Sequence, residues 1–491
     1  MAALGLLACS ASPSGSPVSP QPPVVAGPSP CSGGSGTAGS CSQQPQPPGQ
    51  QPPPSSGTSG QTLGGSGDTP HTPDVPDVTV DGGMPSPEPM SMGPGTVMAD
   101  PMDEAVHIYD PAVVHTFDLE IAPADLEMVD SNPSAEQYVP ARLTFEGVSY
   151  DVGYRYKGSI GAFFPPCTSL FGQKDGKCSV KLSFNWKDPK GQFFGLKKLL
   201  FHSMNSDPSM LRERLGYALF REMGVPAARV THAILRVNGM AHVYALVEEI
   251  DGRFTRSRFT EGGKGNLYKE IWPIHDDPQA YIAALETNED QDPSADRILR
   301  FKDAIRQSPE AMEAWMDLDV TASYMAVDRV IMNDDGAFHF YCFAGAIGNN
   351  PKPPGNHNYY WYEAKHADRL WIIPWDLDLS MSEALNPPHL ESDWRTMPSA
   401  DQCTGCEGAS AGLAPATLCD RVFLNLHARK ALYEAKVDAF IAGPFSKAAV
   451  DAKLDQWAQQ LLSAGYPAEP SAVSELKAIL DRARMSRGFG Y

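Results

Sequence analysis

The first 99 residues of this chain contain no Phe, Tyr, Trp, Lys or Arg, yet they hold 20 of the 45 prolines and 17 of the 43 glycines. Such a segment cannot bury enough apolar surface to offset the entropy that it would lose on ordering. We therefore predict a disordered linker rich in Pro, Gly and Ser over residues 10–99. The folded domain is expected to occupy residues 105–491, a length that allows a substantial core.

The negative charge of the chain is concentrated in its first third. The formal net charge is −20, but 15 of the 59 acidic residues and none of the 39 basic residues precede Arg142. Residues 142–491 therefore carry only −5. Neither part offers the clustered Lys and Arg that phosphate backbones require, so we expect no nucleic-acid partner.

The N-terminal residues Leu6-Leu7-Ala8-Cys9 resemble the lipobox of bacterial lipoproteins, in which cleavage precedes a cysteine that then carries lipid. Only eight residues, none of them basic, precede Cys9, so residues 1–9 would be a truncated or atypical signal. Either the start codon is misassigned or the match arises by chance. The resemblance implies lipidation of Cys9, membrane contact through that lipid, and an exported protein of the bacterial cell envelope or the extracellular space.

Nine cysteines remain to be explained. Cys403-x-x-Cys406 would suit zinc, but a structural zinc site needs four ligands, and no second CxxC or suitable His pair follows. Disulfides are the better interpretation for an exported protein. We predict a Cys167–Cys178 bridge first, and one pair among Cys403, Cys406 and Cys419 second.

The order of elements predicts an α+β protein in which a strand-rich half with one main helix precedes a helix-rich half. Asn238-Gly239 between two apolar runs indicates a hairpin, and Asp207 with Pro208 indicates a helix start. Strands are expected at 148–157, 179–186, 230–237, 240–247, 359–363 and 370–373. Helices are expected at about 208–223, 251–259, 277–286, 294–306 and 310–332, and from about 417 onward.

Basic and acidic side chains in the strand-rich half suggest a phosphate site. Lys157-Gly158-Ser159 runs from a strand into a small-residue turn, which would let backbone N–H groups approach a phosphate, although a plain hairpin turn has the same sequence. Lys181 points away from the apolar face of its strand, with Lys177 as a rival. Glu213 on the main helix could reach such a lysine, or could be an ordinary helix-surface charge.

Three polar segments of the helix-rich half suggest a metal site. Asn333-x-Asp335-Gly336 ends a long helix, Asn358 opens the following hairpin, and Asp376 and Asp378 follow its second strand. Carboxylate and amide oxygens are the ligands that Mg²⁺ prefers, and one carboxylate can orient an attacking hydroxyl. A single Asp would more simply make a turn, but the ordered set favours a site. Asp376 and Asp378 alternate, so only one of them can easily face it.

These motifs resemble the CotH kinase family, the spore-coat-protein-H-like proteins, over about residues 105–491. The resemblance also rests on Asp207-Pro-Ser-Met-Leu-Arg-Glu-Arg-Leu, Phe220-Arg-Glu-Met-Gly-Val-Pro-Ala and Val247-Glu-Glu-Ile-Asp251. It implies a two-lobed protein-kinase-like fold, with an N-lobe at about 105–250 and a C-lobe at about 251–491. It also implies an atypical kinase that uses ATP and Mg²⁺ or Mn²⁺ to phosphorylate secreted or surface proteins on Ser or Thr.

The resemblance assigns roles to individual residues. Asp335 would act on the acceptor hydroxyl, Lys181 would bind ATP phosphates with Glu213 as its helix partner, and Asp376 with Asn358 would hold the metal, with Asn356 as a competitor for that position. The remaining ATP contacts would come from Lys157, Gly158, Ser159, Glu248 and Glu249.

Departures from the kinase pattern leave an alternative open. The chain has no HRD, DFG or kinase Gly-rich loop, and an insertion of about 15 residues separates Asp335 from Asn358. The alternative is a catalytically inactive, pseudokinase-like envelope or coat protein with a binding or structural role. A further variant keeps phosphotransfer but directs it to a glycan or small molecule.

Overall fold

The computed structural model describes residues 103–158, 167, 177–259, 263–288, 293–333, 335–338, 356, 358–382 and 420–487. The predicted signal and linker lie outside these residues. So do Cys9, Ser159, Cys403, Cys406 and Cys419, and the predictions made for those residues concern parts of the chain that the structure does not describe.

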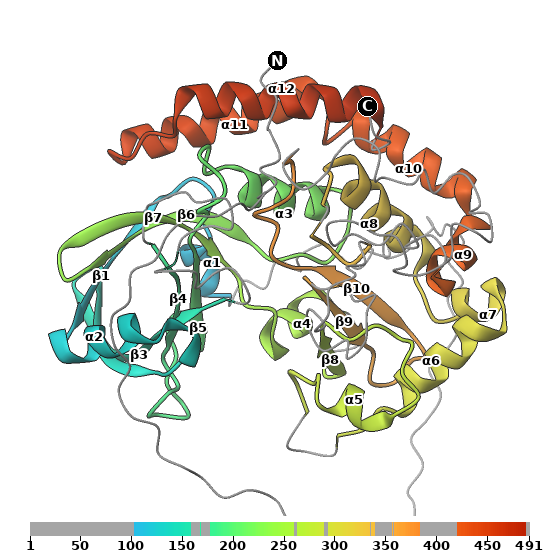
Figure 1. Ribbon diagram of the computed structural model, residues 1–491, viewed down its shortest axis with the longest axis horizontal. Coiled ribbons are helices and arrows are strands. Elements are labelled where there is room, and N and C mark those ends of the chain that lie inside the picture. Colours follow the sequence, from blue (N-terminus) through green and yellow to red (C-terminus); the bar gives the residue numbers. More distant parts are fainter. Residues whose placement is uncertain are drawn as a thin grey trace, which may run out of the picture. The chain divides into compact units, whose positions relative to one another are not determined.

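Seven strands close into a barrel in the order β1-β2-β3-β4-β5-β7-β6 (Figure 1). Neighbouring strands pair antiparallel except β1 and β6, which run parallel with Phe117 opposite Leu235, and this pairing closes the barrel. The strands are β1 (His115–Ile121), β2 (Val139–Phe145), β3 (Val148–Lys157), β4 (Ser179–Ser183), β5 (Lys198–His202), β6 (Val230–Val237) and β7 (Met240–Val247).

Alternating side chains fill the barrel interior. In β1 the pattern of burial follows the pleat, with Phe117, Leu119 and Ile121 inside. The short helix α1 (Ala105–Ile108) contributes Ala105 and Ile108 to the same core, while α2 (Pro123–Ser131) and a 3₁₀ turn (Pro133–Ala135) connect β1 to β2.

A second sheet and most of the helices follow the barrel. The sheet has the order β10-β9-β8, and Tyr359 of β9 lies opposite Pro374 of β10. Its strands are β8 (Asn266–Lys269), β9 (Tyr359–Glu363) and β10 (Leu370–Pro374). The helices are α3 (Arg212–Glu222), before β6, and then α4 (Gly252–Arg258), α5 (Pro278–Ile282), α6 (Asp296–Gln307), α7 (Pro309–Glu313), α8 (Leu318–Val330), α9 (Arg421–His427), α10 (Lys430–Ala442), α11 (Lys447–Ser463) and α12 (Pro470–Ser486).

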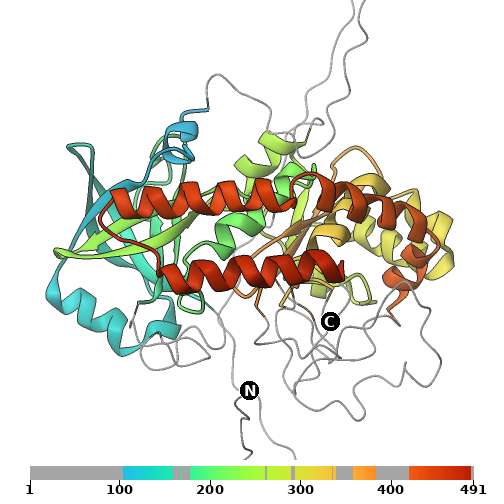
Figure 2. The same cartoon turned by 90° about the horizontal axis from the view of Figure 1, so that it is seen from above.

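The two long helices α11 and α12 run antiparallel past α3 and α8 (Figure 2). On α11, Trp457 lies under the guanidinium of Arg214 from α3, at 4.4 Å from guanidinium carbon to ring centre, and Gln460 accepts a hydrogen bond from the same guanidinium. One continuous apolar core joins strands β5 to β7, α3, the second sheet and the C-terminal helices.

The predicted two-lobed kinase-like fold is wrong. The strands do not form an open N-lobe sheet with one main helix, because the parallel pairing of β1 with β6 closes them into a seven-stranded barrel. The second half holds a three-stranded sheet, of which the sequence predicted β9 and β10 but not β8. Among the described residues, one apolar core runs from β5 through α3 and the second sheet to α12, so the predicted boundary near residue 250 does not separate two cores.

Several local predictions are confirmed. The bounds of β3, β6, β7 and β9 match the expected strands, and the main helix exists but begins at Arg212 instead of residue 208. The Asp207 carboxylate accepts the N–H groups of Ser209 and Arg212, so residues between them form a turn before the helix. The expected helix at 310–332 is divided into α7 and α8, because Asp317 caps a new helix start.

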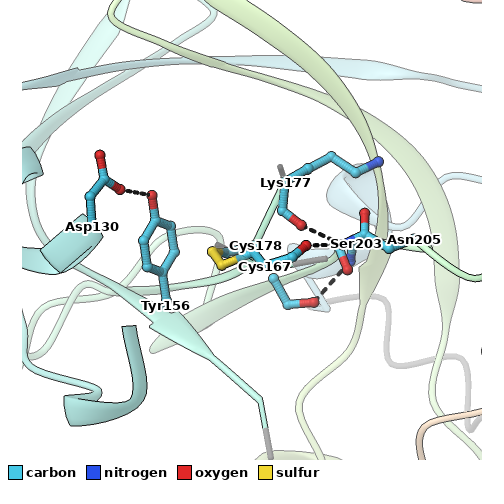
Figure 3. Close-up of a disulfide and its surroundings, with 8 residues drawn as sticks. Asp130, Tyr156, Cys167, Lys177, Cys178, Ser203 and Asn205 are labelled. Atoms are coloured by element: carbon cyan, nitrogen blue, oxygen red, sulfur yellow. Dashed lines mark hydrogen bonds between the residues drawn. A yellow bond between two sulfur atoms is a disulfide. The ribbon is translucent and has the colours of Figure 1, made fainter. Parts of the chain in front are cut away.

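The predicted Cys167–Cys178 disulfide is present (Figure 3). The side-chain amide of Asn205 donates to the carbonyl oxygens of Cys167 and Lys177, at 2.7 Å each, and so holds both ends of the bridged segment. Within the described part of the chain, no helix combines the length and apolarity needed to cross a membrane.

Candidate functional site

The candidate site lies where the beginning of β9 and the end of β10 meet α8 and α3. The sheet register continues beyond the strands, because the N–H of Trp375 donates to the carbonyl of Asn358 over 3.1 Å. The N–H of Met381 donates to the carbonyl of Ile331 at the end of α8. These bonds bring the three acidic and amide segments predicted from sequence to one place.

The turn after α8 positions Asp335. Asn333 is buried, and its amide donates to Asp328 over 2.8 Å, while its carbonyl accepts the N–H of Gly336. A Cβ at Gly336 would lie 2.2 Å from the amide nitrogen of Asn333. The Asn-x-Asp-Gly spacing therefore packs a tight turn that requires glycine at its end.

The two candidate asparagines have different surroundings. The amide of Asn358 donates to both the carbonyl and the carboxylate of Asp335, at 2.8 Å each. Asn356 donates instead to the carbonyl of Ala337 and accepts from the hydroxyl of Tyr359. Asn358 is thus the asparagine that the structure brings to Asp335.

Asp376 is held in a left-handed backbone conformation, with φ of 51°, and Asn358 has φ of 62°. Non-glycine residues rarely adopt this region, although Asn and Asp tolerate it best. The N–H of Asp376 donates to the hydroxyl of Tyr217 on α3 over 3.0 Å. Gly216 permits this approach, because a Cβ there would lie 3.0 Å from Leu377.

A lysine, a histidine and a glutamate form a hydrogen-bonded chain beside Asp376. Nζ of Lys157, at the end of β3, lies 3.0 Å from Nε2 of His202, at the end of β5. Nδ1 of His202 lies 2.5 Å from Oε1 of Glu213 in the first turn of α3, and 3.8 Å from Oδ1 of Asp376. Glu213 and His202 are buried, whereas the Asp376 side chain is 39% exposed.

The protonation of this chain is set by burial. Burial, with a smaller contribution from Lys157, lowers the pKa of His202 to about 3, so its ring is neutral at pH 7. A neutral ring carries one N–H. Either Lys157 donates to Nε2 and Nδ1–H donates to ionised Glu213, or protonated Glu213 donates to Nδ1 and Nε2–H donates to a neutral amine.

Burial also acts on the two ends of the chain. It lowers the pKa of Lys157, against the opposing effect of Asp376, and raises the pKa of Glu213 well above its usual value, with a further rise from Asp376. These shifts bring the two protonation patterns closer in free energy. Sequence reasoning missed His202, the middle member of this chain.

Asp378 belongs to the same electrostatic group. Burial raises its pKa well above the usual value, and the nearby carboxylates of Asp376, Glu213 and Asp335 raise it further. The four carboxyl groups therefore share one region of unfavourable negative potential, with Lys157 as a nearby cation that opposes it.

The sequence suggested that Glu213 reaches Lys181, but the structure does not bring these two side chains together. The ammonium of Lys181 lies 2.9 Å from Oε1 of Glu249, which Lys198 also contacts at 3.2 Å. The rival Lys177 donates to the carbonyl of Val243 on the barrel. Lys157 is instead the lysine that joins Glu213, through His202.

The other predicted ATP contacts are placed as follows. Glu248 is buried in an ion network with Arg229, Arg253 and Arg258. Burial would raise its pKa, but the guanidinium groups of Arg258 and Arg229 lower it to about 2. Glu249 pairs with lysines, as above. Gly158 is exposed, and its N–H donates to Glu136.

The group formed by His202, Glu213 and Asp376 has a donor set that fits a divalent cation. One ligand atom from each lies within 4.8 Å of the others. Among the described residues, Oε2 of Glu213 is buried and accepts no hydrogen bond. The Asp376 carboxylate raises the pKa of Glu213, and carboxylates crowded in this way are what a hard cation such as Mg²⁺ would neutralise.

Comparison with known proteins agrees with the sequence motifs. Residues 155–484 match the family described as CotH kinase protein, and this range contains the whole candidate site. The chain is also similar to the inner spore coat protein H of Bacillus subtilis (strain 168). The two are 20% identical over 280 residues, which cover 57% of this chain and 72% of that protein.

Proposed function

Because this chain belongs to the CotH kinase protein family, we propose that it transfers the γ-phosphoryl group of ATP to a Ser or Thr hydroxyl of an unidentified protein, with Mg²⁺ or Mn²⁺ as cofactor. The observation that carries the proposal is the convergence of Asp335, Asn358 and Asp376 with the Lys157–His202–Glu213 chain. Phosphoryl transfer depends mainly on positioning and charge neutralisation, and this donor set supplies both.

Lys157 takes the phosphate-binding role in this proposal. Among the charges that act on Lys157, Asp376 has the largest effect, whereas Lys181 is held by Glu249. The His202–Glu213 pair fixes the position of the ammonium. Lys181 and Lys269 add positive potential around it, because both act on Lys157 electrostatically.

Asp335 orients the acceptor hydroxyl and takes its proton as the new P–O bond forms and the bond to the β-phosphate oxygen breaks. Asn358 holds the Asp335 carboxylate by its amide hydrogen bond. Asp376, together with Asn358, Glu213 and Asp378 as further oxygen donors, would hold the cation. A bound divalent cation would offset the charge of the phosphate oxygens.

The test is transfer of label from γ-labelled ATP in the presence of MgCl₂ to casein and to the chain itself. Wild type should label, Asp376→Ala should not, and Asp335→Ala should lose nearly all activity. Asp368→Ala is a matched control, because Asp368 lies in the β9–β10 turn and pairs with Arg300. Equal labelling by wild type and Asp376→Ala would sink the proposal.

A second candidate is a non-catalytic component of a spore coat or cell envelope. It is favoured by the name of the related inner spore coat protein H. That name and the family match also support an envelope or coat location, to which a lipidated Cys9 would add a membrane anchor. Thermal unfolding with ATP and MgCl₂ separates the two functions, because a ligand that binds the native state raises its stability by RT ln(1 + [L]/Kd). No shift at millimolar ATP would favour the structural role.

A further inference from the structure

A second cluster of metal-ligating side chains lies at the barrel, outside the family-matched residues 155–484. His107 comes from α1, His115 is the first residue of β1, and Glu146 lies in the turn between β2 and β3. One nitrogen or oxygen atom of each residue lies within 4.8 Å of those of the other two. Nothing in the phosphotransfer proposal uses these residues.

The donor atoms of His107 and Glu146 are spaced almost as two ligands of one ion would be. Nε2 of His107 lies 2.9 Å from Oε1 of Glu146. Two ligand atoms on a tetrahedral ion with bonds of about 2.0–2.1 Å are roughly 3.3 Å apart. A change of a few tenths of an ångström therefore converts this contact into a pair of ligands.

His115, the buried histidine of the cluster, makes the kind of hydrogen bond that a metal-binding histidine usually makes with its other ring nitrogen. Nε2 of His115 lies 2.8 Å from the carbonyl oxygen of His107, to which it donates. This bond leaves the lone pair on Nδ1 of His115. A ring N–H bound to a backbone carbonyl is the arrangement that fixes the tautomer and orientation of a ligating imidazole.

The surroundings are apolar on the inside and open on the outside. His115 is buried, and its ring packs against Phe117 and Phe145 with centres 6.3 and 5.3 Å away. The side chains of His107 and Glu146 are 44% and 53% exposed. An ion can reach the cluster from solvent and still contact one buried ligand.

The backbone at Glu146 is a second, independent indication. Glu146 has φ of 49° and Gly147 has φ of 82°, so both central residues of the hairpin turn are left-handed. Asn, Asp or Gly is preferred at the first of these positions. Glutamate has no such preference, and strain of this kind is concentrated at ligand sites.

We propose that His107, His115 and Glu146 bind a divalent ion of the Zn²⁺ class, with a fourth position open to water. Two imidazoles and one carboxylate form a common three-ligand set for zinc, and imidazole ligands select such ions over Mg²⁺. The ion would join α1 to the β2–β3 turn. The competing interpretation is a plain surface ion pair between His107 and Glu146, which would bind no metal.

The test is titration calorimetry of the full chain, freed of metal with a chelator and titrated with ZnCl₂. Wild type should bind one equivalent more than His107→Ala or Glu146→Gln. Matched controls are Glu120→Gln, an exposed glutamate on β1, and His366→Ala, an exposed histidine in the β9–β10 turn. Zinc that binds elsewhere, at cysteine thiols or at the Asp376 site, binds to all these proteins alike. It therefore cancels when the zinc stoichiometry of a variant is subtracted from that of wild type.

Thermal unfolding provides a second readout. ZnCl₂ should raise the midpoint of wild type and both controls above that of either ligand variant, whose metal-free midpoints should stay near wild type because both side chains are exposed. Equal zinc stoichiometry in wild type and the two ligand variants would overturn the proposal. So would an equal zinc-induced shift of the midpoint in all of them.

Discussion

The backbone N–H of Asp376 donates a 3.0 Å hydrogen bond to the hydroxyl of Tyr217, which lies 159 positions earlier in the chain. This bond joins α3 to the segment after β10 and supports the left-handed backbone of Asp376. Tyr217→Phe should therefore destabilise the protein by about 1–3 kcal/mol, because it leaves a partly buried N–H without its partner. Urea unfolding measures the change.

The control for this variant is Tyr466→Phe, in the loop between α11 and α12. If the two substitutions cost the same free energy of unfolding, the Tyr217 hydroxyl does not support Asp376. Under the proposed function, Tyr217→Phe should also lower the transfer rate more than it weakens ATP binding.

Substitution of the lysines distinguishes the two candidates for phosphate binding. Lys157→Met should lower kcat/KM by about 100-fold or more, as expected when one preorganised donor is lost. Lys181→Met should have a smaller effect, because its ammonium is held by Glu249. Lys190→Met, on the exposed surface, is the matched control. A larger loss in Lys181→Met would return the role to Lys181.

Reduction of the Cys167–Cys178 disulfide should destabilise the fold. The bridge closes a loop with a sequence separation of 11 residues, and the chain-entropy account assigns about 3 kcal/mol to a loop of that size. Urea unfolding with and without dithiothreitol measures the effect. The double variant Cys167→Ser/Cys178→Ser should be insensitive to dithiothreitol. If it responds as wild type does, another disulfide is responsible.

Glu363 should make stability depend on pH. Burial raises its pKa to about 7, so the folded state keeps a proton that the unfolded state releases. The free energy of unfolding should fall as the pH rises from 4.5 to 7, by about 3 kcal/mol at 1.36 kcal/mol per pKa unit. Below pH 4.5 this contribution should be constant.

Glu363→Gln removes the titration while keeping an acceptor for the hydroxyl of Tyr268. The free energy of unfolding of this variant, measured in urea at a series of pH values, should keep the fall that other buried carboxyls such as Asp420 cause. It should lose the fall of about 3 kcal/mol that Glu363 adds between pH 4.5 and 7. Glu475→Gln on the exposed face of α12 should retain it. Parallel profiles for wild type and Glu363→Gln would contradict the assignment.

Helices and strands of this fold could be predicted where residues close together in the sequence carry the pattern. The Asn238-Gly239 turn and the apolar runs beside it predicted β6 and β7 with the same first and last residues that the structure shows. β1 and β2 were not predicted, and the turn from β2 to β3 carries Glu146 where Asn or Asp would have indicated a hairpin. The barrel could not be predicted, because its closing pair joins Phe117 to Leu235, and no local pattern encodes that pairing.

The same limit applies to the candidate site. Asp335, Asn358 and Asp376 were recognisable because each follows or precedes a strongly patterned element. His202 was missed because β5, which it ends, was not predicted, although a polar residue after Leu199-Leu200-Phe201 was the available signal. The choice between Lys157 and Lys181 needed the register of β3 with β4, which strand alternation alone does not supply.

The contact of α11 with α3 has a consequence for synthesis. Arg214 is buried, and its guanidinium depends on Trp457 and Gln460 for much of its surroundings. During translation α3 emerges long before α11, so this charge must stay hydrated until more than 200 further residues have followed. Domains generally fold as units while the ribosome advances. The packing around α3 is therefore complete only after α11 has been made, and a nascent chain that ends before residue 447 should bind chaperones and be readily cleaved by proteases.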